Sequence, residues 1–293
     1  MRKVNIGLVG CGTVGSGVVK GLARNGALMG SRLGVSFSLG GVAVRNPRKA
    51  RAARLAKSLV TSDWESLVRD PKIDVVMELM GGTTTARKVM AEALKLGKPV
   101  ITANKALISA HGESIFRLVE KNGGNLYYEA SVAGGIPIIK SLREGLSGNR
   151  IQRLYGILNG TCNYILTEMR EKRLSFETVL EDAQKLGYAE GEPSVDVDGV
   201  DAAHKLALLS TLAFGTRVSF DDVYTEGIRH VSLQDIDYAE EFGYRIKLLG
   251  SARMTEHGLE QQQQRHLGRG NVGWADGQSD EADGEHDRTL KNN

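Results

Sequence analysis

The sequence predicts an α/β protein, in which a doubly wound parallel sheet precedes a second, α+β domain. Apolar runs that read as buried parallel strands lie at 4–10, 37–45, 73–80, 98–102 and 125–129. Helical segments alternate with them, near 13–28, 47–59, 63–70, 83–96 and 111–122. Turn signals such as Gly81-Gly82 and Gly123-Gly124 mark the joins between strand and helix.

The pattern changes after residue 130, so we predict a dinucleotide-binding domain over 1–130 and a substrate-binding domain over 131–258. The second part combines strands and helices without strict alternation, with strands expected at 150–158 and 244–252 and helices at 160–172, 176–186, 200–214 and 232–241. Residues 259–293 are Gln-rich and acidic and contain few large apolar side chains. Such a segment buries too little surface to offset its ordering entropy, so we expect a disordered tail.

The composition is that of an ordinary soluble protein. Of the 293 residues 41% are apolar and 25% are charged, and the net charge is +3. No basic patch favours nucleic acid, and no apolar run approaches the roughly 18–20 residues of a membrane span. Cys11 and Cys162 lie in different motifs, which indicates a reducing compartment rather than a disulfide framework or a zinc site. We therefore expect a cytoplasmic protein.

A glycine-rich turn follows the first strand and opens the first helix: Gly10-Cys11-Gly12-Thr13-Val14-Gly15. In this position the spacing is typical of a Rossmann-like domain, where glycines let the backbone approach a pyrophosphate at a helix N-terminus. The alternative is a tight strand–helix turn without a ligand. We favour a dinucleotide site that includes Gly10, Gly12, Thr13, Val14 and Gly15.

Further cofactor contacts are expected at the ends of the next strands. Arg45, with Arg48 and Lys49 close behind, stands where many such domains place an acid on the ribose. Cations there favour the 2′-phosphate of NADP over NAD, although solvated basic residues at a helix start are the alternative. Gly82, behind Glu78, permits close approach of the cofactor, and Asn104-Lys105 after the fourth strand should lie near the nicotinamide.

The acidic loop Gly187–Asp198 runs into an apolar helix that carries Asp201, His204 and Lys205. A largely apolar helix is normally buried, and a lysine within it needs a partner. Carboxylates gathered around an ammonium suit a polar, amine-bearing substrate and a proton relay. The alternative is an ordinary i,i+4 ion pair on a solvated face, worth roughly 0.2–0.5 kcal/mol. This segment alone leaves the two interpretations balanced.

Six segments together resemble homoserine dehydrogenase, which interconverts L-aspartate 4-semialdehyde and L-homoserine with NAD(P). They are IGLVGCGTVGSGVV, VMELMGG, ITANKALI, YYEASVAGGIPII, GILNGTCNYIL and GYAEGEPSVDVDGVDAAHKLALL, in family order from residue 4 to about 258. The resemblance implies a Rossmann-like fold with a substrate and dimerisation domain, a homodimer, and a place in threonine and methionine biosynthesis.

The resemblance also implies roles for individual residues. Lys205 matches the family's proton-transferring lysine and Lys105 a second active-site lysine. Substrate-binding positions fall on Glu190, Asp201, Asp196 and Gly187, with Asp196 orienting. Glu129, Val132, Gly134 and Ile136 match positions whose oxygens bind a sodium ion.

Two features depart from the family pattern. Cys162 stands where threonine is expected, and the resemblance stops near Gly258, where unrelated sequence follows in place of further strands of the substrate domain. The principal hypothesis is an active, NADP-preferring homoserine dehydrogenase. The alternatives are an impaired relative that at most binds nucleotide, another dehydrogenase of small aldehydes or amino acids, and a binding or structural protein of other ancestry.

Overall fold

The computed structural model describes residues 1–47, 55–189, 191–256 and 258–269, and it divides into two compact units. Unit 1 comprises residues 1–158, 201–224 and 250–262, and unit 2 comprises 159–200, 225–249 and the segment from 263. The sequence predicted contiguous domains with a boundary at 130. In the structure the chain instead leaves unit 1 at Leu158 and returns to it at Asp201.

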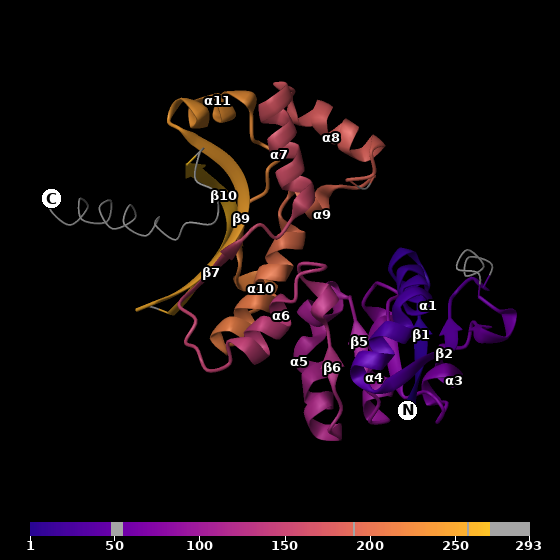
Figure 1. Cartoon of the computed structure of the whole chain (residues 1–293). Helices are drawn as coiled ribbons and strands as arrows, with labels where there is room; N and C mark the ends of the chain where they lie inside the picture. The colour runs from indigo at the N-terminus through magenta and orange to yellow at the C-terminus, as the bar shows by residue number, and fades with distance from the viewer. Residues whose placement is uncertain (48–54, 190, 257, 270–293) are drawn as a thin grey trace. The chain divides into compact units, whose positions relative to one another are not determined.

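Unit 1 contains a six-stranded parallel sheet in the order β3-β2-β1-β4-β5-β6 (Figure 1). Its strands are β1 (Arg2–Val9), β2 (Val35–Ala43), β3 (Val60–Thr61), β4 (Val75–Glu78), β5 (Val100–Thr102) and β6 (Leu126–Tyr127). The helices between them are α1 (Thr13–Leu33), α3 (Trp64–Arg69), α4 (Thr84–Lys95) and α5 (Lys105–Asn122), with a 3-10 turn at Lys57–Leu59. The predicted Rossmann-like doubly wound sheet is confirmed.

The central part of the sheet is buried, where the carboxyl-terminal halves of β1 and β2 and the middle of β4 are apolar. Leu8, Val42 and Val76 are fully buried in the centre, and Val89 and Met90 of α4 are fully buried against the sheet. Strand order reverses direction between β1 and β4, and at such a reversal the loops leave a crevice at the carboxyl ends of the strands. Gly10, after β1, donates its N–H to Ala43 O (2.9 Å), which ties the end of β1 to the end of β2.

After β6 the chain of unit 1 forms a 3-10 turn (Glu129–Ser131), α6 (Ile138–Lys140), a π-helical turn (Ser141–Gly145) and β7 (Arg153–Gly156). The long helix α10 (Val200–Phe214) also belongs to unit 1. Its apolar side packs Leu206 and Ala207 against Val223 and Ala252, and Leu209 joins the core of the parallel sheet. The burial predicted for this helix is confirmed.

Unit 2 is built around the helices α7 (Gly160–Lys172), α8 (Phe176–Lys185), α9 (Ser194–Val197) and α11 (Leu233–Glu241). Ile165 and Met169 of α7 are fully buried in its core, with Val179 of α8 against them. Asn163 is buried in this core and is satisfied by two hydrogen bonds with the backbone of Leu248 (3.0 and 3.1 Å).

A second sheet has the order β7-β9-β10-β8, formed with β8 (Tyr224–Thr225), β9 (Tyr244–Thr255) and β10 (Gly258–Arg269). β9 and β10 are its two long strands (Figure 1), and β7 pairs antiparallel with β9. The sequence predicted disorder from 259 onward, but residues 259–269 form most of β10. The remainder of the predicted tail, 270–293, lies outside the described residues, as does most of the helix predicted at 47–59.

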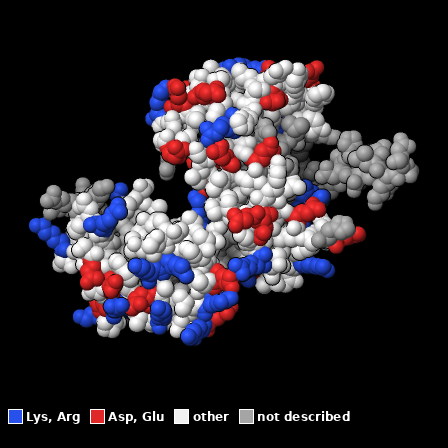
Figure 2. Space-filling model, turned by 180° about the vertical axis from the view of Figure 1, so that it is seen from behind, with Lys and Arg blue, Asp and Glu red and all other residues white. Residues whose placement is uncertain are grey.

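Acidic and basic side chains are intermingled on the face drawn in Figure 2 rather than gathered by sign. Within the described ranges, no helix has both the length and the apolar character needed to cross a membrane.

Candidate active site

The glycine-rich turn leaves an open cradle at the start of α1. A Cβ on Gly10, whose φ is +98°, would lie 2.6 Å from the backbone of Leu79, and one on Gly15 would lie 2.2 Å from Gly10 O. These two glycines are therefore required by the close packing of β1, α1 and the loop after β4. A Cβ on Gly12, in contrast, would meet nothing within 4 Å.

The helix start above Gly12 has the properties of an anion site. Gly12 is the N-cap of α1 and contributes no side-chain hydrogen bond, and the first turn carries no acidic residue. The first N–H groups of an α-helix have no partner within the helix, and with the positive end of the helix dipole they favour an anion. Thr13 and Val14 are exposed at this helix start. The turn fits the pyrophosphate of a dinucleotide.

A hydrogen-bond chain joins the ends of β4 and β5 to the start of α5. Glu78 is fully buried, and its carboxylate accepts from Thr102 Oγ1 (2.8 Å) and from Met80 N (3.0 Å). Thr102 Oγ1 in turn accepts from Asn104 N (3.0 Å). Asn104 caps α5 by accepting from Leu107 N (3.1 Å), and its Nδ2 donates to Gly82 O (2.7 Å). These hydrogen bonds hold the backbone at the start of α5, where Lys105 is the first residue.

The cationic positions are only partly described. Arg45 lies two residues after Ala43, the last residue of β2, and is exposed, so its guanidinium is accessible to a ligand. Arg48 and Lys49 lie outside the described residues.

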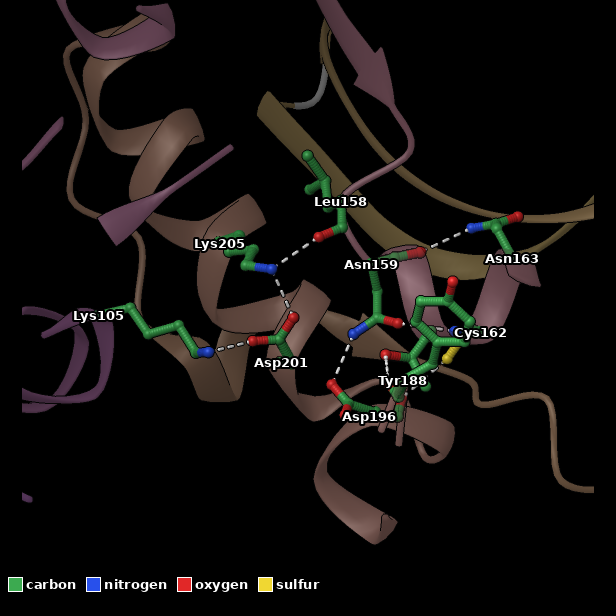
Figure 3. Close-up of polar contacts among 10 residues, drawn as sticks. Lys105, Leu158, Asn159, Cys162, Asn163, Tyr188, Asp196, Asp201 and Lys205 are labelled. Atoms are coloured by element: carbon green, nitrogen blue, oxygen red, sulfur yellow. Dashed lines mark hydrogen bonds and ion pairs between the residues drawn. The ribbon is translucent and has the colours of Figure 1, made fainter. Parts of the chain in front are cut away.

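Asp201 lies between two lysines from different parts of unit 1 (Figure 3). Its Oδ2 accepts from Lys205 Nζ (2.6 Å), one turn further along α10, and its Oδ1 contacts Lys105 Nζ from the first residue of α5. Lys205 Nζ also donates to the carbonyl oxygen of Leu158 (2.8 Å). Within the described part of the chain Lys205 thus has two acceptors, which leaves one of its three donor positions for a ligand.

Burial decides between the two interpretations of this segment. The side chain of Asp201 is 4% exposed and that of Lys205 is 18% exposed, so the pair does not lie on a solvated helix face. Burial by itself raises the pKa of Asp201, but hydrogen bonds from Lys105 and Lys205 outweigh it and hold that pKa below its ordinary value. Asp201 is therefore a carboxylate that holds two ammonium groups together in one site.

In unit 2, Asp196 is tied to the start of α7 (Figure 3). Its Oδ1 accepts from Asn159 Nδ2 (2.7 Å), and its carbonyl oxygen accepts from the buried thiol of Cys162 (3.1 Å). Asn159 Oδ1 accepts from Cys162 N (2.9 Å) and so caps α7. Cys162 thus makes the hydrogen bond that a threonine hydroxyl could also donate, which accounts for the exchange.

The loop that precedes Asp196 is anchored at the same helix. Thr161 Oγ1 donates to Tyr188 O (2.9 Å), and the Tyr188 ring lies against that of Tyr164 at 4.8 Å. Gly187 has φ +78°, a backbone conformation that favours glycine, and open space where a side chain would lie. Glu190 lies outside the described residues.

The expected sodium positions lie in the loop after β6. Both carboxylate oxygens of Glu129 accept backbone N–H groups, from Ile139 (2.8 Å) and Lys140 (2.9 Å), and Ile136 O accepts from Ile138 N (2.8 Å). Ala133 adopts φ +47°, so the chain between these residues turns sharply. With Val132 and Gly134 the set offers oxygen donors, which are the ligand type of a hard cation. Its chemistry fits such an ion.

The chain is similar to known proteins over both units. Residues 10–129 match the NAD-binding domain of homoserine dehydrogenase, and residues 137–270 match the homoserine dehydrogenase domain. A crystal structure of a putative homoserine dehydrogenase from Archaeoglobus fulgidus shares 33% identity and a TM-score of 0.82, over 92% of this chain and 85% of that one. The chain belongs to the homoserine dehydrogenase family.

Longer members of the family are more similar in sequence. The homoserine dehydrogenase of Pseudomonas aeruginosa is 48% identical over 260 residues, 89% of this chain and 59% of that protein. The homoserine dehydrogenase structure from Thiobacillus denitrificans shares 48% identity and a TM-score of 0.87, over 91% of this chain and 62% of that one. The chain thus spans about 59% of the length of its curated relative. Its family places a nicotinamide nucleotide in the domain that spans 10–129.

Several groups of the site were not found by sequence reasoning. The carbonyl of Leu158, the amide of Asn159 and the Thr102 hydroxyl all make contacts that depend on the fold. The only signal in the sequence for Asn159 was its place before Gly160-Thr161, where an N-cap is expected.

Proposed function

We propose that this chain carries the homoserine dehydrogenase reaction, the interconversion of L-aspartate 4-semialdehyde and L-homoserine, in threonine and methionine biosynthesis. The observation that carries the proposal is Asp201 holding Lys105 and Lys205 together in a largely buried site. An ordinary ion pair on the protein surface has no need of burial. Proton transfer to a developing alkoxide is favoured by a buried site, because a positive charge stabilises the alkoxide more strongly where water is excluded.

The protein's own residues account for the acid–base half of the reaction. A nicotinamide nucleotide, when bound, supplies the hydride that reduces the aldehyde carbon. As charge develops on the aldehyde oxygen, the Lys205 ammonium stabilises it and donates the proton that completes the alcohol. Asp201 keeps both lysines in place, and Lys105 adds a second positive charge beside the carbonyl.

The remaining site residues take supporting roles in the proposal. By resemblance to the family, Glu190 and Asp201 would bind the substrate's ammonium, and Asp196, held by Asn159, would be an orienting residue, with Gly187 allowing close approach of the ligand. Glu129, Val132, Gly134 and Ile136 would hold sodium. We also infer a cytoplasmic enzyme that acts as a homodimer through the second sheet.

Lys205→Ala tests the reaction. NADPH consumption by the purified chain with L-aspartate 4-semialdehyde should fall at least 10²-fold, because the group that protonates the alkoxide is gone. Lys140→Ala, which removes an exposed lysine of the same unit, is the matched control and should leave turnover unchanged. Turnover that survives in Lys205→Ala would overturn the assignment of the proton donor. No turnover in the wild-type chain would sink the proposed activity.

The chain should prefer NADP(H) over NAD(H). The support is the exposed cation Arg45 at the end of β2, followed in sequence by Arg48 and Lys49. Arg45→Ala should weaken NADPH binding about tenfold while NADH binding stays constant, because only NADPH carries a 2′-phosphate. Cofactor fluorescence titrations measure both affinities. Equal losses for the two cofactors would exclude a 2′-phosphate contact.

A further inference from the structure

His204 is a polar group of α10 that the proposed reaction does not use. Its Nδ1 lies 2.7 Å from Ser109 Oγ of α5, and its ring stacks on Phe220 with centroids 4.2 Å apart and planes inclined by 23°. The ring is therefore held both at its edge and on its face.

The bond to Ser109 lies one helical turn from the lysine–carboxylate contact. Lys105 and Ser109 are four residues apart on α5, and Asp201 and His204 are three apart on α10, so each pair shares a helix face. The contacts Lys105–Asp201 and Ser109–His204 thus join the same two helices at successive turns. The two helices also share an apolar core, in which Ile108 of α5 and Leu209 of α10 are buried, and the two polar contacts add a specific register to that packing.

The charge state of the ring suits this role. Burial lowers the pKa of His204, and the nearby Lys105 lowers it further, whereas Asp201 and Asp221 act in the opposite direction. The lowered pKa favours the neutral ring, which joins the helices without adding a third cation beside Lys105 and Lys205.

We propose that His204 is a positioning residue, whose Nδ1 hydrogen bond to Ser109 holds α5 against α10 so that Asp201 engages Lys105 and Lys205 at once. It touches no reacting atom. The kinetic consequence rests on the proposed function, whereas the effect on the position of Lys105 does not.

Matched substitutions separate the hydrogen bond from the bulk of the ring. The side-chain amide of His204→Asn reaches the place of Nδ1, whereas that of His204→Gln reaches the place of Nε2. His204→Gln and Ser109→Ala should each lower kcat about tenfold, with KM for NADPH unchanged, and His204→Asn should recover most of the loss. The double variant His204→Gln/Ser109→Ala should be no slower than either single one, because both remove one bond. Ser114→Ala, on the same helix, is the control.

A second readout does not need turnover. In protein labelled with 13C at the lysine Cε, the signals of Lys105 and Lys205 are assigned with Lys105→Arg and Lys205→Arg. In His204→Gln and Ser109→Ala the Lys105 signal should move toward that of a solvated lysine, while the thermal midpoint stays close to that of wild type. If His204→Gln does not fold, kcat and the Lys105 signal of Ser109→Ala alone test the positioning role.

The outcomes distinguish the two proposals. An unmoved Lys105 signal together with wild-type kcat in both variants would overturn the positioning role. The positioning role would also fail if His204→Asn were as slow as His204→Gln, since the Nδ1 bond would then not matter. An inactive wild-type chain in which Ser109→Ala still shifts the Lys105 signal would refute the proposed reaction and leave the positioning role standing.

Discussion

At Asp201 one buried carboxylate faces two ammonium groups, so removing its charge leaves both without a counter-ion. We expect Asp201→Asn to lower the free energy of unfolding by about 3 kcal/mol, the low end for a broken buried pair, because Lys105 is 38% exposed. Urea unfolding at pH 7 measures this. Glu144→Gln is the control: the side chains of its pair, Lys140 and Glu144, are 66% and 68% exposed, and such pairs contribute at most about 1 kcal/mol. Equal losses in the two variants would contradict the buried pair.

The same substitution should change the acid dependence of stability. The folded-state pKa of Asp201 lies below its ordinary value of 3.8, so its contribution is complete above about pH 3.8 and is lost as the pH falls through the folded-state pKa. The pKa of His204 is also lowered from 6.5, so stability is lost below about pH 6.5 as the pH falls toward its folded-state value. Asp201→Asn should remove the first dependence. The loss of stability below about pH 6.5 that is linked to His204 should persist. Its size should change, because Asp201 is one of the charges that act on the pKa of His204.

Among the elements, those with a strong periodic signal were predicted well. The helix expected at 200–214 is α10, which is preceded by Gly199 at φ +84° and followed by Gly215 at φ +64°. The helix expected at 160–172 is α7, because Asn159 provides its N-cap. In both cases the apolar run and the residues that end it are local, so the sequence alone is sufficient.

Elements defined by their partners were missed. β10 is rich in glutamine and carries no apolar alternation, yet it lies between β9 and β8 in the second sheet, where backbone pairing sustains it. α5 begins at Lys105 rather than near 111, because the Asn104 cap is in turn positioned by Thr102. The contact of Lys105 with Asp201 joins helices far apart in the chain. No local pattern could reveal it, although each residue was a candidate by itself.

At the scale of the molecule, the two units have separate hydrophobic cores. The parallel sheet and the side of α10 belong to unit 1, whereas Ile165, Met169 and Val179 lie in the core of unit 2. The glycine-rich turn belongs to unit 1, so the cofactor binding that we propose at Gly12 should act first on the stability of that unit. A ligand that binds only the folded state stabilises it by about 2.7 kcal/mol at a hundredfold excess over its dissociation constant.

Gly12→Asp tests that coupling without relying on turnover. Aspartate is a good N-cap, and a Cβ at this position meets nothing within 4 Å, so the free protein should unfold at about the wild-type temperature. Its charge and bulk occupy the space of the pyrophosphate, so the rise in unfolding temperature that NADPH causes in the wild type should disappear. Gly17→Ala, in open space further along α1, should keep the rise in full. If NADPH still raises the unfolding temperature of Gly12→Asp, the cofactor binds away from this turn. If the rise is lost in Gly17→Ala as well, the loss comes from a change in helix α1 rather than from the phosphate site.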